Sequence, residues 1–261
     1  MCKVIAIANQ KGGVGKTTSS VNIGAGLTAK GKKVLHVDLD PQGSLTICLG
    51  HDPEKLTNTI AELIDGMIRR QPVLSAQDCI IVNDEGLELL PSNIGLSMVE
   101  NAIVTATSRE YIVKRLLEPL RPYYDYIILD CLPSLGMLTI NALTACDSVI
   151  VPIQAQYLSL KGFELLMNTI SMVKEETNPR IEIAGILITM YNSTTLSKDV
   201  RKALIETYGS TSIPVFNTAI SSSIKAAEQS TSGKSIYLYK PNSKTAIEYE
   251  QLVREVLDNG I

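Results

Sequence analysis

Short runs rich in Val and Ile alternate with longer amphipathic stretches, and this alternation restricts the fold more than any other feature of the chain. Five runs have the pattern of buried strands: Lys3–Ala8, Val34–Asp38, Tyr126–Asp130, Ser148–Pro152 and Ile183–Thr189. Helical stretches are predicted at Thr17–Lys30, Gly136–Ala145, Leu158–Glu176 and Leu196–Tyr208. Continuous apolar strands separated by helices favour a parallel sheet that is covered on both faces. We therefore predict a single α/β domain over residues 1–261, with a mostly parallel, twisted sheet and helices on both faces.

Two further parts of the chain differ from this pattern. The segment from Asp52 to Ser108 is the least regular part of the sequence. An amphipathic helix is predicted at Lys244–Leu257, followed by Asn259 and Gly260 as a helix end. Its polar face is acidic, so we expect this helix to pack on the core and not to bind a membrane.

Charge, cysteine content and the first residues exclude several protein classes. The net charge is −3, so binding to nucleic acid would need a local basic patch. The five cysteines are odd in number and contain no CxxC pair, which is typical of a reduced protein and not of a disulfide framework or zinc module. The start MCKVIAIANQ has no leader pattern, and no apolar run approaches the roughly 18 residues of a membrane span. We expect a cytoplasmic protein without stable membrane association.

A glycine-rich segment lies between the first predicted strand and the first predicted helix. It contains Lys11, Gly12, Gly13, Val14, Gly15, Lys16, Thr17 and Thr18. Glycines let the backbone curl around an anion, and the N–H groups of a helix N-terminus attract negative charge. Lys16 is placed to reach the β- and γ-phosphates of a nucleotide, and the Thr17 hydroxyl to ligate Mg²⁺. The alternative is a glycine-rich turn that binds nothing, and Lys16 and Thr17 argue against it.

Three carboxylates stand at or just after the ends of predicted strands. Asp38 and Asp40 follow the second run, and Asp130 ends the third. The carboxyl ends of parallel strands share the edge of the sheet on which the glycine loop lies. Mg²⁺ keeps several waters that carboxylates can hold, so Asp130 and Asp38 are candidates to act on the metal through water. For Asp38 and Asp40, a structural role such as a turn or helix cap is the alternative.

Four blocks in order give the chain a resemblance to a known family. KGGVGKTT resembles the deviant Walker A motif of the ParA/MinD-type P-loop ATPases, and is most similar to ParA/Soj partition ATPases. The other blocks are VDLDPQGSLTICLG, ILDCLPSLG and VPIQAQYLSLKG, and the segment GKSIYLYKPNSKTAIEY resembles the family's closing part. The resemblance covers nearly the whole chain. It departs from the family at Leu132-Pro133, where a Pro-Pro pair is usual.

The resemblance implies an ATPase that uses ATP and Mg²⁺. It implies that Asp40 orients or deprotonates the attacking water, and that Lys11 crosses a dimer interface to reach the partner's ATP. Adenine contacts are expected near Thr189 and Met190. Cys131 invites comparison with a redox or iron–sulfur relative, and a buried structural thiol is the alternative that we favour.

The resemblance also implies partners. ParA-like ATPases form homodimers with ATP, bind double-stranded DNA without sequence preference and respond to a ParB-like adaptor. Two arginine positions common in the family are replaced here, by Ser222 in one segment and by Ser193 or Thr194 in another. The remaining basic candidates are Lys198, Arg201 and Lys202 on one predicted helix, with Lys225 and Lys234 further on. A solvated basic face without a partner is the alternative.

Three other functional classes share some of these motifs. A MinD-like membrane switch would need a basic amphipathic tail, and this tail is acidic. A ligase-type or metal-carrying relative would need a metal pair or a substrate cluster, and the sequence shows neither. An ATPase that positions a cargo other than DNA shares every motif named above.

Overall fold

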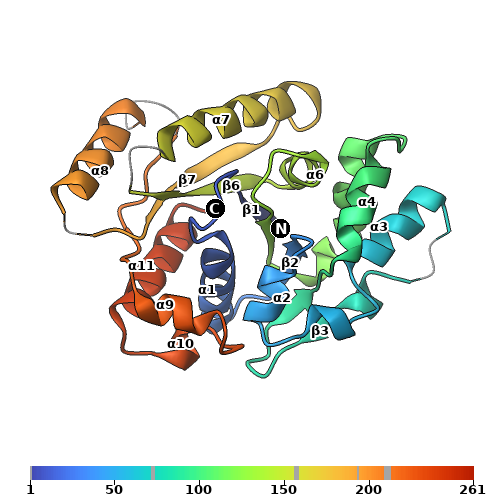
Figure 1. Ribbon diagram of the computed structural model, residues 1–261, viewed down its shortest axis with the longest axis horizontal. Helices are drawn as coiled ribbons and strands as arrows, with labels where there is room; N and C mark the ends of the chain where they lie inside the picture. Colours follow the sequence, from blue (N-terminus) through green and yellow to red (C-terminus); the bar gives the residue numbers. More distant parts are fainter. Residues whose placement is uncertain (1, 72–73, 156–158, 193, 209–212) are drawn as a thin grey trace.

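A twisted sheet of seven strands runs through the centre of the computed structural model, which describes residues 2–71, 74–155, 159–192, 194–208 and 213–261 (Figure 1). The strand order is β3-β4-β2-β5-β1-β6-β7. Neighbouring strands are parallel, except that β3 and β4 are antiparallel. The strands are β1 Lys3–Ile7, β2 Val34–Leu39, β3 Ile81–Val82, β4 Glu88–Leu90, β5 Tyr126–Cys131, β6 Ser148–Gln154 and β7 Glu182–Thr189. The mostly parallel sheet predicted from the sequence is confirmed.

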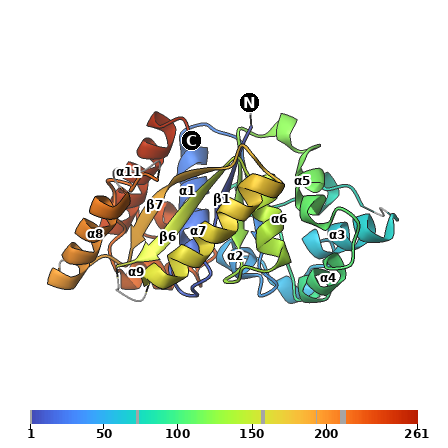
Figure 2. The same cartoon turned by 90° about the horizontal axis from the view of Figure 1, so that it is seen from above.

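Helices cover both faces of this sheet. They are α1 Lys16–Ala29, α2 Ser44–Cys48, α3 Ile60–Arg69, α4 Gly95–Ile103, α5 Ile112–Leu117, α6 Met137–Ala145, α7 Ser159–Glu176, α8 Thr195–Tyr208, α9 Ile224–Gln229, α10 Ile236–Tyr239 and α11 Lys244–Asp258. Apolar side chains of α3 to α8 share one core with the sheet, and those of α1, α10 and α11 share another. Figure 2 shows α7 and α6 along the face of the sheet that α3 to α8 cover.

The central strand β1 shows why the apolar runs are continuous. Val4 and Ala6 point into the core under α3 to α8, and Ile5 and Ile7 point into the core under α1 and α11. Side chains alternate between the faces of a strand, so a strand covered on both faces needs apolar residues at every position. β1 also lies between β5 and β6, which fixes the position of the loop that follows it.

The segment between Asp52 and Ser108 contains order that the sequence pattern did not reveal. It forms α3 and α4 and the two short strands β3 and β4. Helix α3 begins with a capping box in which Thr59 and Glu62 satisfy each other's backbone N–H groups. β3 and β4 have 2 and 3 residues, too few for a period-2 pattern to be recognised.

The other predicted boundaries are close to the structure. β5 continues one residue past Asp130, and α1 begins at Lys16 and not at Thr17. Leu158, the predicted start of a helix, and Ser193 lie outside the described residues. The tail helix α11 buries Tyr249, Leu252, Val253 and Val256 in the core, as expected. None of the helices among the described residues is both long and apolar enough to cross a bilayer.

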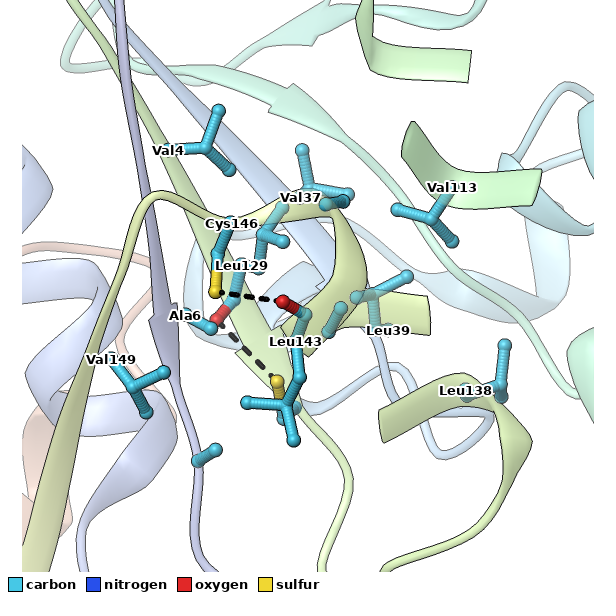
Figure 3. Close-up of a cluster of buried hydrophobic side chains, with 14 of the residues drawn as sticks. Val4, Ala6, Val37, Leu39, Val113, Leu129, Leu138, Leu143, Cys146 and Val149 are labelled. Carbon is cyan, nitrogen blue, oxygen red and sulfur yellow. Dashed lines mark hydrogen bonds between the residues drawn. The ribbon is translucent and has the colours of Figure 1, made fainter. Parts of the chain in front are cut away.

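Cys131 and Cys146 are buried thiols on the α6 side of the sheet. The Cys146 Sγ donates to the Leu143 carbonyl at 3.5 Å (Figure 3). The Cys131 Sγ donates to the Leu129 carbonyl at 3.9 Å. Burial raises the pKa of both thiols, and the Asp130 charge raises the pKa of Cys131 further. Protonated, buried thiols are poor nucleophiles and poor metal ligands, so the surroundings of Cys131 fit a structural thiol.

Candidate active site

The glycine-rich loop between β1 and α1 forms an open cradle. Gly13 and Gly15 have φ values of +71° and +83°, a region that favours glycine. A Cβ atom at Gly12 or Gly13 would meet no atom within 4 Å. Gly15 is the N-cap of α1, and no side chain of the described residues caps this helix end. The N–H groups of the first turn are therefore available to an anion.

Three hydrogen bonds hold this loop in its curled shape. The Asn9 amide donates to the Pro152 carbonyl of β6 at 2.7 Å, and its Oδ1 accepts the Lys11 N–H at 3.0 Å. The Lys16 Nζ spans the loop and donates to the Lys11 carbonyl at 3.0 Å. Burial lowers the pKa of the Lys16 ammonium, and the nearby Asp130 charge partly offsets this effect. An ammonium with one hydrogen bond has further donors for a phosphate.

Asp130, on β5, is bonded to two hydroxyls of α1. Thr17 Oγ1 donates to its Oδ2 at 2.7 Å, and Ser20 Oγ donates to its Oδ1 at 2.7 Å. The carboxyl is 1% exposed, and burial raises its pKa to about 6 against the effect of these two bonds. Ser20 was not among the predicted residues. Its spacing of three from Thr17 places both hydroxyls on one face of α1, which is the signal that would have found it.

Asp38, on β2, pairs in register with Asp130 across the β2–β5 ladder. Its Oδ2 accepts the Thr46 N–H and the Thr46 hydroxyl, each at 2.8 Å, and its Oδ1 accepts the Asp40 N–H at 3.1 Å. Burial is the main cause that raises its pKa to about 7, with the Asp130 charge next. Thr46 was not predicted from the sequence, because its contact with Asp38 forms only when α2 folds back over the end of β2.

Asp40 and the turn after it lie next to the two buried carboxylates. The Asp40 Oδ1 accepts the Gln42 N–H at 2.9 Å, and its backbone carbonyl accepts the Gly43 N–H at 2.9 Å. The Asp40 charge raises the pKa of both Lys16 and Asp130, so the carboxylate lies near the loop. Asp40 thus stabilises a turn, which is the structural role given above as the alternative for it. It also lies near the cradle.

The residues at the cradle fit a magnesium ion held chiefly by a nucleotide. Among the described residues no group of three or more His, Cys, Asp or Glu side chains is arranged to hold a metal. Mg²⁺ commonly takes one or two protein oxygens, waters and phosphate oxygens, so a complete protein cage is not needed. The Thr17 hydroxyl, the Asp130 carboxyl to which it is bonded, and Asp38 opposite Asp130 in the ladder supply oxygen donors of the right kind.

A second hollow continues from the loop and has a volume of about 340 Å³. It is lined by Gly15 of the loop and Thr18 of α1, by Thr189 and Met190, and by part of the segment from Ile220 to Ser230. Thr189 Oγ1 donates to the Val14 carbonyl at 2.8 Å, which fixes β7 against the loop. Its lining includes Thr189 and Met190, near which we expect the adenine contacts. Tyr249, which also lines it, was not predicted and bonds to Ser19 at 3.1 Å.

The five basic candidates are spread over three places. Lys198, Arg201 and Lys202 lie on α8, Lys225 on α9 and Lys234 in the turn before α10. Lys202 pairs with Glu206 at 3.6 Å and Lys225 with Glu228 at 2.9 Å, while Arg201 donates to the Asn217 carbonyl at 2.9 Å. Exposed pairs of this kind contribute little stability, so these lysines can exchange partners.

The loop, the helix N-terminus and the strand-end carboxylates together define a P-loop nucleotide site of the deviant Walker A type. A family model described as "AAA domain" matches residues 2–183. The sporulation initiation inhibitor protein Soj of Bacillus subtilis is 41% identical over 265 residues, which cover 100% of both chains. The chromosome partitioning protein ParA of Caulobacter vibrioides is 37% identical, over 98% of this chain and 94% of the relative. The chain belongs to the ParA/Soj family of P-loop ATPases.

A solved structure shows which ligands such a site takes. A cobyrinic acid a,c-diamide synthase from Mycobacterium smegmatis, with bound ATP analogue and magnesium, is 39% identical with a TM-score of 0.86. The alignment covers 100% of this chain and 96% of that chain. The same protein is also known with ADP and magnesium. The cofactors of this family site are ATP and Mg²⁺, as the sequence led us to expect.

Proposed function

We propose that this chain is a partition ATPase in which ATP drives homodimer formation and DNA binding. In the proposed cycle the Mg·ATP dimer binds double-stranded DNA without sequence preference. A ParB-like adaptor stimulates hydrolysis, which is slow without it, and hydrolysis releases the dimer from DNA. The main support is the full-length identity of 41% to Soj, together with the intact loop. The proposed location is the cytoplasm, on the nucleoid.

We assign the roles in hydrolysis from the position of each group. The N–H groups of residues 12–18 and the Lys16 ammonium bind the phosphates. Thr17 would ligate the metal, and Asp130 and Asp38 would hold its waters. Bound Mg²⁺ would neutralise charge on the phosphate oxygens. Asp40 orients or deprotonates the attacking water, and its turn through Gln42 fixes the direction of the carboxylate.

Lys11 is the residue that we assign to the dimer. It lies at the outer end of the loop, beside the exposed Gly12 and Gly13. A second chain can approach this open face, and positive charge near the γ-phosphate stabilises phosphoryl transfer. Hydrolysis that needs a lysine from the partner chain proceeds only in the dimer.

DNA binding is tested by a gel shift on a non-specific duplex with ATP, with ADP and without nucleotide. We expect a shift with ATP only. A Lys225→Ala variant weakens it without changing ATP affinity, whereas Lys32→Ala, at the far end of α1 from the loop, serves as the matched control. Equal DNA binding in all three nucleotide states would contradict the proposal. Unchanged DNA affinity of Lys225→Ala would contradict the assignment of Lys225 to the DNA site.

The alternatives differ in partner and not in the ATP site. The MinD-like reading has little support, because the apolar face of α11 is buried in the core. Flotation with liposomes tests it. An ATPase that positions a cargo other than DNA remains the second candidate, since it needs the same site. DNA binding that fails while ATP still drives dimerisation would favour this candidate.

A further inference from the structure

A small hollow of about 160 Å³ lies between the end of α3, the loop before α5 and α5 itself. Half of its lining residues are apolar, and the others are Arg70, Thr107, Ser108 and Arg115. The volume is room for a few waters or for one phosphoryl or carboxylate group. In both views α3 lies at one end of the molecule and α8 at the other (Figures 1 and 2). The hollow is therefore separate from the DNA candidates on α8.

Both arginines of the hollow lack an acidic partner. Arg70 and Arg115 are exposed, and neither has an ion pair or a side-chain hydrogen bond among the described residues. Arg69, directly before Arg70, instead pairs with Asp65 at 2.8 Å. The hollow has no acidic residue in its lining. Two guanidinium groups without a neutralising carboxylate attract an anion to this place.

Two hydroxyl groups add donors to the same hollow. The side chains of Thr107 and Ser108 are exposed, and neither hydroxyl is hydrogen-bonded within the described parts of the chain. A guanidinium offers a fork of N–H donors that matches two oxygens of a phosphate, and a hydroxyl can donate to a further oxygen. These donors suffice for the terminal oxygens of a phosphate group.

Charge favours a phosphate monoester over other anions. A phosphate monoester carries a charge of about −1.5 to −2 near pH 7. A carboxylate carries a single charge, and so does each phosphodiester of a nucleic acid. Two unneutralised arginines match the doubly charged group best.

A wider hollow of about 370 Å³ adjoins the first and shares Ser108 and Arg115 with it. Tyr111, Lys114 and Glu118 complete its lining. The aromatic ring offers an apolar surface, and the Glu118 carboxylate accepts hydrogen bonds from hydroxyl groups. The wider hollow thus suits the hydroxylated carbon skeleton of a small molecule.

We propose that the two hollows together bind a small phosphate monoester with a hydroxylated carbon skeleton, of the sugar phosphate class. The phosphate group lies between Arg70 and Arg115, and the carbon skeleton lies beside Tyr111. This site is distinct from the nucleotide loop and from the DNA candidates, and it does not rest on the proposed function.

The backbone of Arg70 permits a sharp test. Its φ of +57° at the C-cap of α3 lies in the left-handed region, which favours glycine. Arg70→Gly therefore relieves backbone strain and removes the guanidinium in one step. The variant should unfold at the same temperature as wild type or higher, so a loss of binding in it is not a loss of folding.

Titration calorimetry tests binding on the full chain saturated with ADP and Mg²⁺. The probes are the phosphate monoesters of glucose, ribose and glycerol, with inorganic phosphate and the three unphosphorylated compounds for comparison. We expect one of the monoesters to bind more tightly than inorganic phosphate, and the unphosphorylated compounds not to bind. Arg70→Gly and Arg115→Ala should each weaken the monoester about tenfold or more.

Arg69→Ala is the matched control, because Arg69 is an exposed arginine of the same helix that already pairs with Asp65. It should bind the monoester as wild type does. Absence of binding for all three monoesters, inorganic phosphate that binds as tightly as they do, or equal affinity in all variants overturns the proposal.

Two further measurements separate this site from those for ATP and DNA. Lys16→Ala should keep the affinity of wild type for the monoester. Affinity that is lost in Lys16→Ala and kept in Arg70→Gly would place the phosphate in the nucleotide loop and overturn the proposal. The gel shift with ATP should be equal for wild type and Arg115→Ala. A weaker shift in Arg115→Ala, without binding of a monoester to wild type, would make the hollow a nucleic-acid contact and also overturn it.

Discussion

At the scale of single residues, the site depends on a few groups whose positions are fixed by hydrogen bonds from distant parts of the chain. Lys16 reaches across the loop to the Lys11 carbonyl, and Thr17 and Ser20 hold Asp130 from α1. Each of these groups can be changed singly, and each change has a different expected effect.

Lys16→Ala should remove most of the affinity for ATP. A charged hydrogen bond to a phosphate contributes about 1.5–3 kcal/mol, so a loss of roughly 10- to 100-fold is expected. Titration calorimetry with an ATP analogue and Mg²⁺ measures this. Lys33→Ala, at an exposed lysine just before β2, is the control and should bind as wild type does. Unchanged affinity in Lys16→Ala would contradict the assignment.

Asp40→Ala should separate binding from hydrolysis. We expect ATP affinity to be kept and the turnover rate to fall by about 100-fold, the usual contribution of a positioned base. The variant should accumulate as a dimer with ATP, measured by light scattering after gel filtration. Asp258→Ala, at an exposed position, is the control. A monomer in the presence of ATP would count against both the role of Asp40 and its link to dimer formation.

His36 should make the protein less stable in acid. It is fully buried in β2, and desolvation lowers its pKa from 6.5 to about 4. Above pH 6.5 both folded and unfolded chains carry the neutral ring. Below it the unfolded chain binds a proton first, so stability falls between pH 6.5 and about pH 4 and then levels off. From the linkage relation, the loss at pH 5 is about 2 kcal/mol.

Urea denaturation at pH 7 and pH 5 measures this contribution. Other groups also titrate in that interval, so the pH effect in wild type is compared with that in His36→Gln, which has no titrating ring. The variant should show the smaller loss. If both proteins lose the same stability, His36 is not the responsible group.

At the scale of elements, α1 packs closely on β2. A Cβ atom at Gly24 of α1 would lie 2.0 Å from His36 Nε2. Gly24→Ala gains about 1 kcal/mol of helix propensity, but overpacking costs about 1–3 kcal/mol, so net destabilisation is expected. Replacing His36 by Ala in the same chain should turn the effect of Gly24→Ala into a gain. A more stable Gly24→Ala single variant would contradict the tight contact.

The elements that could be predicted from the sequence are those with long, uniform patterns. β1, β2, β5, β6 and β7 are buried on both faces, and such strands have continuous apolar runs. The phosphate loop was found because its glycines, lysine and threonine are contiguous in the chain.

The remaining contacts join residues that no local pattern connects. Thr46 bonds to Asp38 because α2 turns back over the end of β2. Tyr249 reaches the hollow beside the loop from α11, more than 200 residues from Ser19. The capping box of Thr59 and Glu62 was a local signal for α3, and it could have been used. The roles of the site residues stay predictions until ligands are seen.

At the scale of the whole molecule, DNA binding should depend on the dimer and on salt. The basic candidates lie on α8, on α9 and before α10, so each chain offers a few dispersed contacts. If each subunit contacts about two phosphates, the dimer contacts about four, and log affinity against log salt has a slope near −3.6. Anisotropy with a labelled duplex and ATP at several salt concentrations measures it. A slope near zero would contradict the DNA proposal.

The most direct test of the nucleotide site is a crystal structure with a non-hydrolysable ATP analogue and Mg²⁺. We predict the triphosphate inside the cradle of residues 12–17, with the Lys16 ammonium on its terminal phosphates and the Thr17 hydroxyl on the metal. A structure in which that loop is empty and the triphosphate is bound elsewhere would contradict this prediction.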